Sequence, residues 1–182
     1  MSRFIAATWR RGPSPQHPIT RLDTVKRMTK TADCYSCSQE TEAGKLPPRE
    51  NIAADEHWRV AHAIGCALEG WLVLLPRRHV TSISELTDAE AQTLGLWQVR
   101  ISRALHQVLG CQKTYIAQFA EAKGFSHVHF HVVPRSPDLP EELRGPRIFQ
   151  LMLPDRPPVT EQRMDEIARE LHHHLARPAG SN

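Results

Sequence analysis

The 182-residue sequence predicts a domain of the α+β class, in which an antiparallel sheet packs against helices. Residues 57–64 and 70–75 have the apolar patterns of β-strands. Residues 88–109 carry apolar side chains at helical spacing behind a capping motif. Residues 113–119 and 126–133 are predicted to be two further strands, and their short connection favours an antiparallel hairpin. A chain of this length suits one compact domain, and therefore one main functional site.

The composition is typical of a soluble globular protein. Hydrophobic residues make up 40% of the chain and charged residues 24%, and the mean hydropathy is −0.45. The longest apolar run is Trp71–Leu75, whereas a membrane-spanning helix needs about 18 apolar residues or more. We therefore expect no transmembrane helix and no membrane partner.

Positive charge is concentrated at the N-terminal end of the chain. Residues 1–33 contain seven Lys or Arg and two Asp, a net charge of +5, so that the remainder holds 16 positive and 18 negative side chains. A nearly neutral domain argues against binding of duplex nucleic acid. Residues 1–32 are interrupted by prolines and lack the apolar stretch of a secretory signal, so we expect a basic, disordered arm before a domain at 33–182.

The first two strands differ in their apolar pattern. Residues 57–64 alternate in the way of a half-buried strand, whereas residues 70–75 are continuously apolar up to Pro76 and predict a strand buried on both faces. The side chains on the buried face of the first strand are predicted to be Trp58, Val60, His62 and Ile64.

The main helix is predicted at residues 88–109. Thr87 and Glu90 form a capping box, in which each side chain accepts a hydrogen bond from the backbone of the other. Gly110 provides a C-terminal stop. The apolar stripe of this helix consists of Leu94, Trp97, Ile101, Leu105 and Val108.

The C-terminal third begins with a Pro-rich segment at residues 134–158, which we expect to run over the surface because proline cannot donate to a sheet. A last helix is predicted after the capping residue Thr160. Its apolar stripe consists of Met164, Ile167, Leu171 and Leu175.

The most informative segment contains His127, His129 and His131. Alternate residues of a strand share one face, so these three imidazoles project together while the intervening Val128, Phe130 and Val132 enter the core. Core packing gives no reason to place three imidazoles on one face. The pattern therefore indicates a functional site, which is either a metal centre with imidazole ligands or a site of nucleophilic catalysis.

A second motif favours one family. Residues 70–80 contain a predicted strand that ends in Pro76-Arg77-Arg78-His79. With this motif and the three alternating histidines, the chain resembles the histidine-triad superfamily of nucleotide hydrolases and transferases. The likeness covers residues 33–135. It implies an antiparallel sheet of about five strands with the 88–109 helix packed on one face, and a homodimer.

The resemblance also implies roles for the histidines. His129 corresponds to the nucleophile that attacks the α-phosphorus of a nucleotide, and His131 to the residue that binds the phosphate or protonates the leaving group. A histidine at position 131 and the following Val132-Val133-Pro134-Arg135 are similar to the dinucleoside-polyphosphate hydrolase branch. The alternatives are a nucleoside phosphoramidase, a nucleotidyltransferase, and a nucleotide-binding or sensing protein with little turnover.

Three further residues are candidates for binding the substrate. Gln118 corresponds to a family residue that contacts the phosphate if the connecting turn is two residues shorter here. Lys123 and Ser126 precede the histidines and either contact phosphate or belong to an ordinary polar turn. The family tends to place Asn or Asp in the nucleoside pocket where this chain has His62 and Ala63, which leaves the base preference open.

Cys34 and Cys37 form a Cys-x-x-Cys pair, which supplies two of the four ligands of a structural zinc site. The resemblance completes the site with His79 and His127; the alternative is a free or redox-active dithiol. Cys66 and Cys111 are expected to be small buried residues, and His172–His174 a solvated surface run. Four cysteines without an export signal indicate a cytoplasmic protein with reduced thiols.

Overall fold

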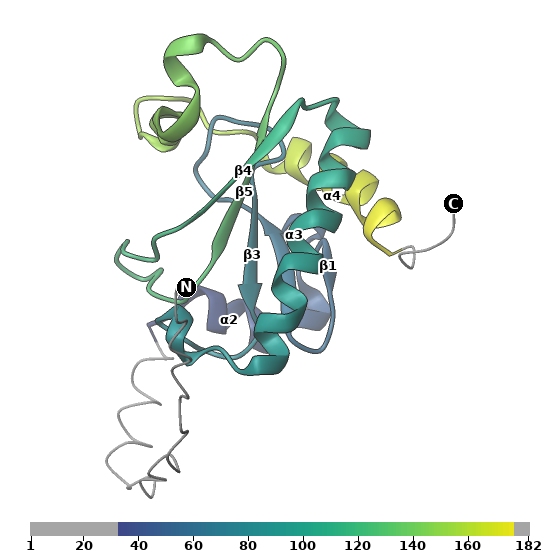
Figure 1. Cartoon of the computed structure of the whole chain (residues 1–182), viewed down its shortest axis with the longest axis vertical. Helices are drawn as coiled ribbons and strands as arrows, with labels where there is room; N and C mark the ends of the chain where they lie inside the picture. Colours follow the sequence, from purple (N-terminus) through teal and green to yellow (C-terminus); the bar gives the residue numbers. More distant parts are fainter. Residues whose placement is uncertain (1–32, 177–182) are drawn as a thin grey trace, which may run out of the picture.

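The computed structural model describes residues 33–176, which form an α+β domain built on a five-stranded antiparallel sheet (Figure 1). The predicted fold class is confirmed. The strand order is β1-β2-β3-β5-β4. The strands are β1 (Ala53–Ala54), β2 (Trp58–His62), β3 (Leu72–Pro76), β4 (Lys113–Gln118) and β5 (Phe130–Arg135), and the α-helices are α2 (Tyr35–Thr41), α3 (Asp88–Leu109) and α4 (Glu161–Leu175). The predicted N-terminal arm at 1–32 lies outside the described residues.

Helix α3 has the predicted bounds because both of its ends are capped locally. The Thr87 side chain accepts from the Glu90 amide, and Glu90 accepts from the Thr87 amide at 2.7 Å. At the other end Gly110 has a φ of 64°, the left-handed conformation that glycine adopts without strain. The helix packs on one face of the sheet, with α4 beside it (Figure 1).

The main core lies between α3, α4 and the sheet. The strands contribute the alternate residues predicted for that face, so Val128 and Val132 are fully buried and Phe130 is nearly so. Their helical partners include Trp97, Ile101, Leu105, Ile167 and Leu171. This packing turns the other set of alternate residues, including the histidines, toward the opposite face of the sheet.

That opposite face is partly covered by the Pro-rich segment, contrary to the expectation that this segment runs only over the surface. It forms two 3₁₀ helices, η4 (Glu141–Leu143) and η5 (Gly145–Met152), seen as the light green turns in Figure 1. Their apolar side chains Leu143, Ile148 and Leu151 are buried in a second core with Trp71. Proline limits sheet pairing but not 3₁₀ turns, so the segment buries apolar residues without joining the sheet.

Two strand predictions need correction. Strand β2 is buried on both faces and not half-buried, because α2 and the 3₁₀ helix η2 (Pro48–Glu50) contact its second face through Arg59. Strand β5 begins at Phe130 and not at Ser126, because its ladder with β3 ends at the pair Leu74–Phe130. The segment before it leaves the ladder, although the Val128 amide still donates to the Val80 carbonyl and the His127 side chain to the Pro76 carbonyl.

Two further 3₁₀ helices, η1 (Ala43–Lys45) and η3 (Ile83–Glu85), complete the described elements. Helix η2 is attached to α4 by Arg49, which forms ion pairs of 2.9 Å with both Glu161 and Asp165. Through this contact the C-terminal helix supports the segment that leads into the sheet.

Candidate active site and metal site

The three imidazoles of the triad lie in two different environments. His129 and His131 line a cavity on the face of the sheet opposite α3, and their ring centroids are 4.8 Å apart. His127 is only 1% exposed and faces the cysteines of α2 instead. The predicted row of imidazoles is therefore divided between a cavity and a candidate metal site.

The orientation of His129 leaves one ring nitrogen available for reaction. Its Nδ1 atom lies 2.8 Å from the backbone carbonyl oxygen of His127, and only a protonated Nδ1 can donate to a carbonyl. The neutral ring then carries its lone pair on Nε2. This tautomer is the one that a nucleophilic imidazole needs.

The opposite tautomer is favoured in His131. The indole Nε1–H of Trp71 donates to His131 Nδ1 at 3.0 Å, so the proton of the neutral ring is on Nε2. Burial, together with the neighbouring His129, lowers the pKa of His131 to about 4. His131 is consequently a neutral N–H donor beside the candidate nucleophile.

The cavity has a volume of about 430 Å³. Its floor consists of small and aliphatic residues of β2 and β3, and its walls include Phe119, Phe125, Phe149 and Met152. The His129 and His131 imidazoles form one end. Tyr35, Ser36, Glu50 and Arg59 also line it. An aromatic, largely apolar cavity with polar groups at its ends is the usual form of a small-molecule site.

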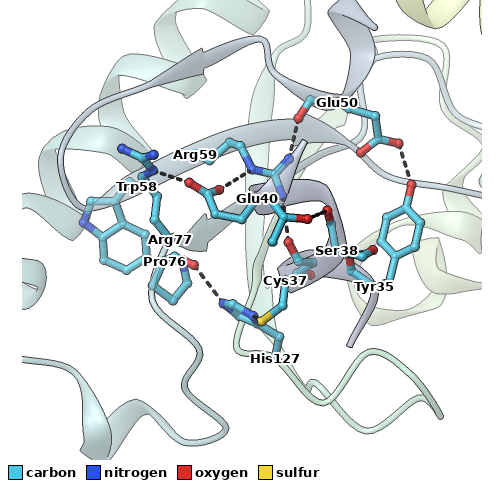
Figure 2. Close-up of polar contacts among 12 residues, drawn as sticks. Tyr35, Cys37, Ser38, Glu40, Glu50, Trp58, Arg59, Pro76, Arg77 and His127 are labelled. Atoms are coloured by element: carbon cyan, nitrogen blue, oxygen red, sulfur yellow. Dashed lines mark hydrogen bonds and ion pairs between the residues drawn. The ribbon is translucent and has the colours of Figure 1, made fainter. Parts of the chain in front are cut away.

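The sequence analysis did not identify the polar group formed by Tyr35, Glu50 and Arg59. Arg59 is 2% exposed, and its guanidinium donates to the backbone carbonyl of Glu50 and to the Glu40 carboxylate (Figure 2). The Tyr35 hydroxyl donates to Glu50 Oε1 at 2.9 Å. The sequence did contain one signal for this group, which is Arg59 inside an otherwise apolar strand. A buried guanidinium requires several acceptors, so polar partners were to be expected around it.

Cys34, Cys37, His79 and His127 form the cluster that the resemblance implied. One ligand atom from each lies within 4.8 Å of all the others. Cys37 Sγ is 3.1 Å from His79 Nδ1 and 3.7 Å from His127 Nδ1, close to the roughly 3.5 Å between ligands of tetrahedral zinc. Two thiols and two imidazoles are a common zinc donor set, so these residues fit the metal.

The surroundings of the cluster favour metal binding by His127. Its Nε2–H donates to the Pro76 carbonyl at 2.8 Å, which directs the Nδ1 lone pair at the thiols (Figure 2). Burial lowers the pKa of His127 to about 4, so the ring is neutral as a ligand requires. Burial and the neighbouring Cys34 raise the pKa of Cys37 to about 12, which a bound cation would reverse.

The remaining predicted site residues lie outside the cavity lining. Gln118 is opposite Phe130 in the β4–β5 register, and opposite residues share a face. Its side chain therefore leaves the sheet on the α3 side, away from the triad. Lys123 and Ser126 are exposed in the loop 119–126, several of whose residues line the cavity.

Other sequence predictions are confirmed. Cys66 and Cys111 are buried, and His172–His174 are exposed on α4. Arg77 and Arg78 engage carboxylates at the end of β3: Arg77 pairs with Glu40, and Arg78 with Glu90 at 2.8 Å. These two arginines are therefore committed to protein partners. No helix in the described part of the chain is long and apolar enough to cross a membrane.

The sequence profile of the HIT domain, the histidine-triad domain, matches residues 47–138, which include β1 to β5, α3 and the triad. The chain belongs to the HIT domain family. This family includes nucleotide hydrolases and members that only bind nucleotides. No curated protein matches the whole sequence closely enough to be counted as a relative.

Solved structures of HIT proteins have the same fold at low sequence identity. A zinc-bound histidine triad family protein from Mycobacterium smegmatis is 22% identical, with a TM-score of 0.58 over 80% of this chain and 95% of that chain. A hypothetical histidine triad nucleotide-binding protein from Sulfolobus tokodaii is 13% identical, with a TM-score of 0.60 over 79% and 92% of the two chains. A histidine triad protein from Marinobacter aquaeolei is 21% identical, with a TM-score of 0.54 over 69% and 88%.

Proposed function

We propose that this HIT protein hydrolyses a nucleotide derivative at its α-phosphate through a covalent intermediate on His129. The observation that carries the proposal is the pair of complementary tautomers in the cavity. His129 is held with its Nε2 lone pair available, next to His131 with its Nε2 proton available. A nucleophile beside a hydrogen-bond donor for the phosphate oxygens suits a two-step displacement at phosphorus.

In the first step His129 Nε2 forms a bond to the α-phosphorus, and the bond from phosphorus to the leaving oxygen breaks. The neutral His131 donates a hydrogen bond from its Nε2–H to a phosphate oxygen, where it stabilises the negative charge that develops as the leaving group departs. Water then attacks the phosphorus, the P–N bond breaks, and a nucleoside monophosphate leaves. Dividing one displacement into two lowers the barrier of each.

The substrate class that we favour is a dinucleoside polyphosphate. Its support is the sequence, namely the histidine at position 131 and the following Val132-Val133-Pro134-Arg135. We also retain Lys123 and Ser126 as candidate phosphate contacts, since both are exposed in the loop beside the cavity.

We further propose structural zinc at Cys34, Cys37, His79 and His127, in keeping with the cluster and with the zinc-bound relative from M. smegmatis. Four protein ligands leave no position for a reactive water, so the bound metal would supply cross-linking and no catalysis. His129 is not needed in this ligand set. We also propose a reducing, cytoplasmic location, because the four cysteines form no disulfide.

A homodimer is the assembly that we propose. Val99 and Leu96 of α3 and Ile116 of β4 are about half exposed, and β4 is an edge strand of the sheet. The Ser102 hydroxyl of α3 lies 2.9 Å from that of Thr114 on β4, so these two elements are neighbours. An apolar helix face beside an open sheet edge suits pairing of two copies.

The test is a turnover screen of the purified chain against dinucleoside polyphosphates, nucleoside phosphoramidates and aminoacyl-adenylates, with His129→Ala as the matched variant. We expect His129→Ala to lose nearly all turnover while nucleotide affinity stays within about tenfold, since the cavity supplies most of the binding. His172→Ala, an exposed histidine on α4, should retain full activity.

Near-normal turnover by His129→Ala would overturn the mechanism. Nucleotide binding without turnover of any of these substrates would instead establish a binding or sensing protein. Transfer of the nucleotidyl group to an added sugar phosphate would establish a transferase. Trapping of a nucleotide on His129 in the wild-type chain, and not in the variant, would support the covalent step.

A further inference from the structure

The end of the cavity distant from the histidines carries charged side chains that the phosphate chemistry does not use. The sheet register defines how far away this end lies. Arg59 is opposite Leu75 on β3, and the neighbouring ladder aligns Val73 of β3 with His131 of β5. Arg59 is therefore two strands across the sheet from the triad segment, about 10 Å at the usual spacing of about 4.8 Å per strand.

A nucleotide whose α-phosphate lies at His129 would extend across this distance, with its base over β2. Ala61 of β2 and Ala63 just after it line the cavity there, and their small side chains leave space above the strand. Phe125 packs against Tyr35 with a centroid distance of 5.4 Å, and both rings line the cavity. Small residues below and aromatic rings beside them suit a planar base.

Glu50 is the hydrogen-bond acceptor at this end. Burial and the Glu50 carboxylate raise the pKa of Tyr35 to about 12, so the phenol keeps its proton and donates it to Glu50 Oε1. The Arg59 guanidinium donates to Glu40 and to the Glu50 backbone (Figure 2). It also donates to the Ser36 carbonyl. Among residues 33–176 no hydrogen bond reaches Glu50 Oε2, although Glu50 is 8% exposed and lines the cavity.

We propose that Glu50 reads the nucleobase and that the cavity prefers guanine, an inference that rests on the proposed nucleotide substrate. Guanine presents the N1–H and 2-amino donors side by side, and a carboxylate accepts from both with its remaining lone pairs. Adenine presents a lone pair at N1, which faces the carboxylate oxygens without a proton between them. A buried acceptor left unpaired in this way discriminates strongly between ligands.

The experiment is calorimetric titration of the full chain with GMP, IMP and AMP. Hypoxanthine keeps the N1–H of guanine but lacks its 2-amino group, so we expect affinity in the order GMP, IMP, AMP, with about tenfold or more between the extremes. Glu50→Gln keeps the size of the side chain and the acceptor for Tyr35, but turns an amide donor toward the base. This variant should lower the affinity for GMP by about tenfold or more. Its affinity for AMP should be at least that of the wild-type chain, since glutamine pairs well with adenine.

Glu40→Gln is the matched control. Glu40 is the carboxylate that pairs with Arg59 but does not line the cavity, so this variant should keep the wild-type ratio of GMP to AMP affinity. Tyr35→Phe leaves the Glu50 carboxylate in place and should also keep the preference for GMP, which tests the idea if Glu50→Gln does not fold.

Equal affinity of the wild-type chain for GMP and AMP would overturn the role of Glu50 and leave the proposed hydrolysis intact. A preference for GMP that persists in Glu50→Gln would also overturn the role of Glu50 and leave the proposed hydrolysis intact. Failure of all three nucleotides to bind would overturn the proposed function as well.

Discussion

The indole of Trp71 sets the chemistry of His131 without reaching the cavity itself. Trp71 is fully buried, and its ring packs edge-on against His131 at 5.8 Å and against Phe149 at 5.1 Å. Its N–H donates to His131 Nδ1, so protonation at Nδ1 would break this hydrogen bond. The contact therefore holds both the tautomer and the neutral state of the imidazole.

Trp71→Phe removes the N–H and keeps most of the ring. We expect kcat to fall by at least about tenfold with little change in nucleotide affinity, since His131 loses the constraint on its proton donor. The pKa of His131, which burial and His129 lower to about 4 in the wild-type chain, should also rise toward the ordinary value for histidine, because no donor then competes with a proton at Nδ1; NMR titration of the ring measures it.

The matched control is Trp58→Phe. Trp58 is equally buried and its indole N–H also makes hydrogen bonds, to Thr93 and the Glu90 carbonyl, but on the α3 side of the sheet. This variant should lose stability without changing the pKa of His131. The same His131 pKa and the same kcat in both variants would show that Trp71 is only a packing residue.

Helix α3 begins where a capping box and an ion pair share one carboxylate. Glu90 is 4% exposed; it accepts from the Thr87 amide and pairs with Arg78 at 2.8 Å. Arg78, with the Thr87 hydrogen bonds, lowers the pKa of Glu90 to about 2. The start of the helix is thereby tied to the end of β3, next to His79 of the candidate metal site.

Glu90→Gln keeps the acceptor oxygen and removes the charge. The pKa of Glu90 is lower in the folded chain than the roughly 4.3 of an unfolded glutamate, so its stabilisation is present above that value and is lost as pH falls toward about 2. Because Arg78 is half exposed, we expect a loss of about 1–2 kcal/mol near pH 7 that shrinks in acid.

Chemical denaturation of both proteins across this pH range measures the difference. Glu166→Gln, which removes an exposed ion pair with Arg163 on α4, should change the free energy of unfolding by less than about 0.5 kcal/mol at any of these pH values. A Glu90→Gln deficit that stays constant down to pH 2 would contradict the ion pair as its cause.

The candidate metal site connects parts of the chain that are distant in sequence. Its ligands come from the start of α2, from the turn after β3 and from the segment before β5. The same helix α2 carries Tyr35 and Ser36, which line the cavity. A bound metal would hold this wall of the cavity against the sheet, and its binding free energy would contribute to folding.

Cys34→Ser should therefore lower zinc content and melting temperature together, while the folded fraction keeps the His129 chemistry. Elemental analysis and thermal unfolding of protein purified without chelator measure both. Cys111→Ala removes a buried cysteine outside the cluster and should leave zinc content unchanged. Zinc retained in Cys34→Ser but lost in His129→Ala would place the metal on the triad and favour a metallohydrolase.

The proposed dimer gives a prediction for the whole assembly. Val99→Glu places a charge on the exposed face of α3, and we expect it to halve the mass measured by sedimentation, since a buried unpaired carboxylate opposes association. Ile83→Glu changes a similarly exposed residue on η3 and should leave the mass unchanged. A monomeric wild-type chain would contradict the dimer.

Features encoded by neighbouring residues were predictable from the sequence. The bounds of α3 follow from Thr87, Glu90 and Gly110, all within one turn of the helix ends. The placing of His129 and His131 together at one cavity follows from the alternation of side chains along a strand, and the second motif at Pro76–His79 indicated the family; the turning of His127 toward the cysteines did not follow from that pattern. The metal ligands came from the resemblance, because residues so far apart have no local signal that joins them.

The tertiary structure decided which side chains meet. Gln118 was a plausible phosphate contact by spacing, but the register pairs it with Phe130 and turns it to the α3 face, since a shift of one residue reverses the face of a strand side chain. Glu50 and Tyr35 come from different helices, and Trp71 reaches His131 across 60 positions of the chain. Such contacts depend on how the elements pack and leave no periodic pattern in the sequence.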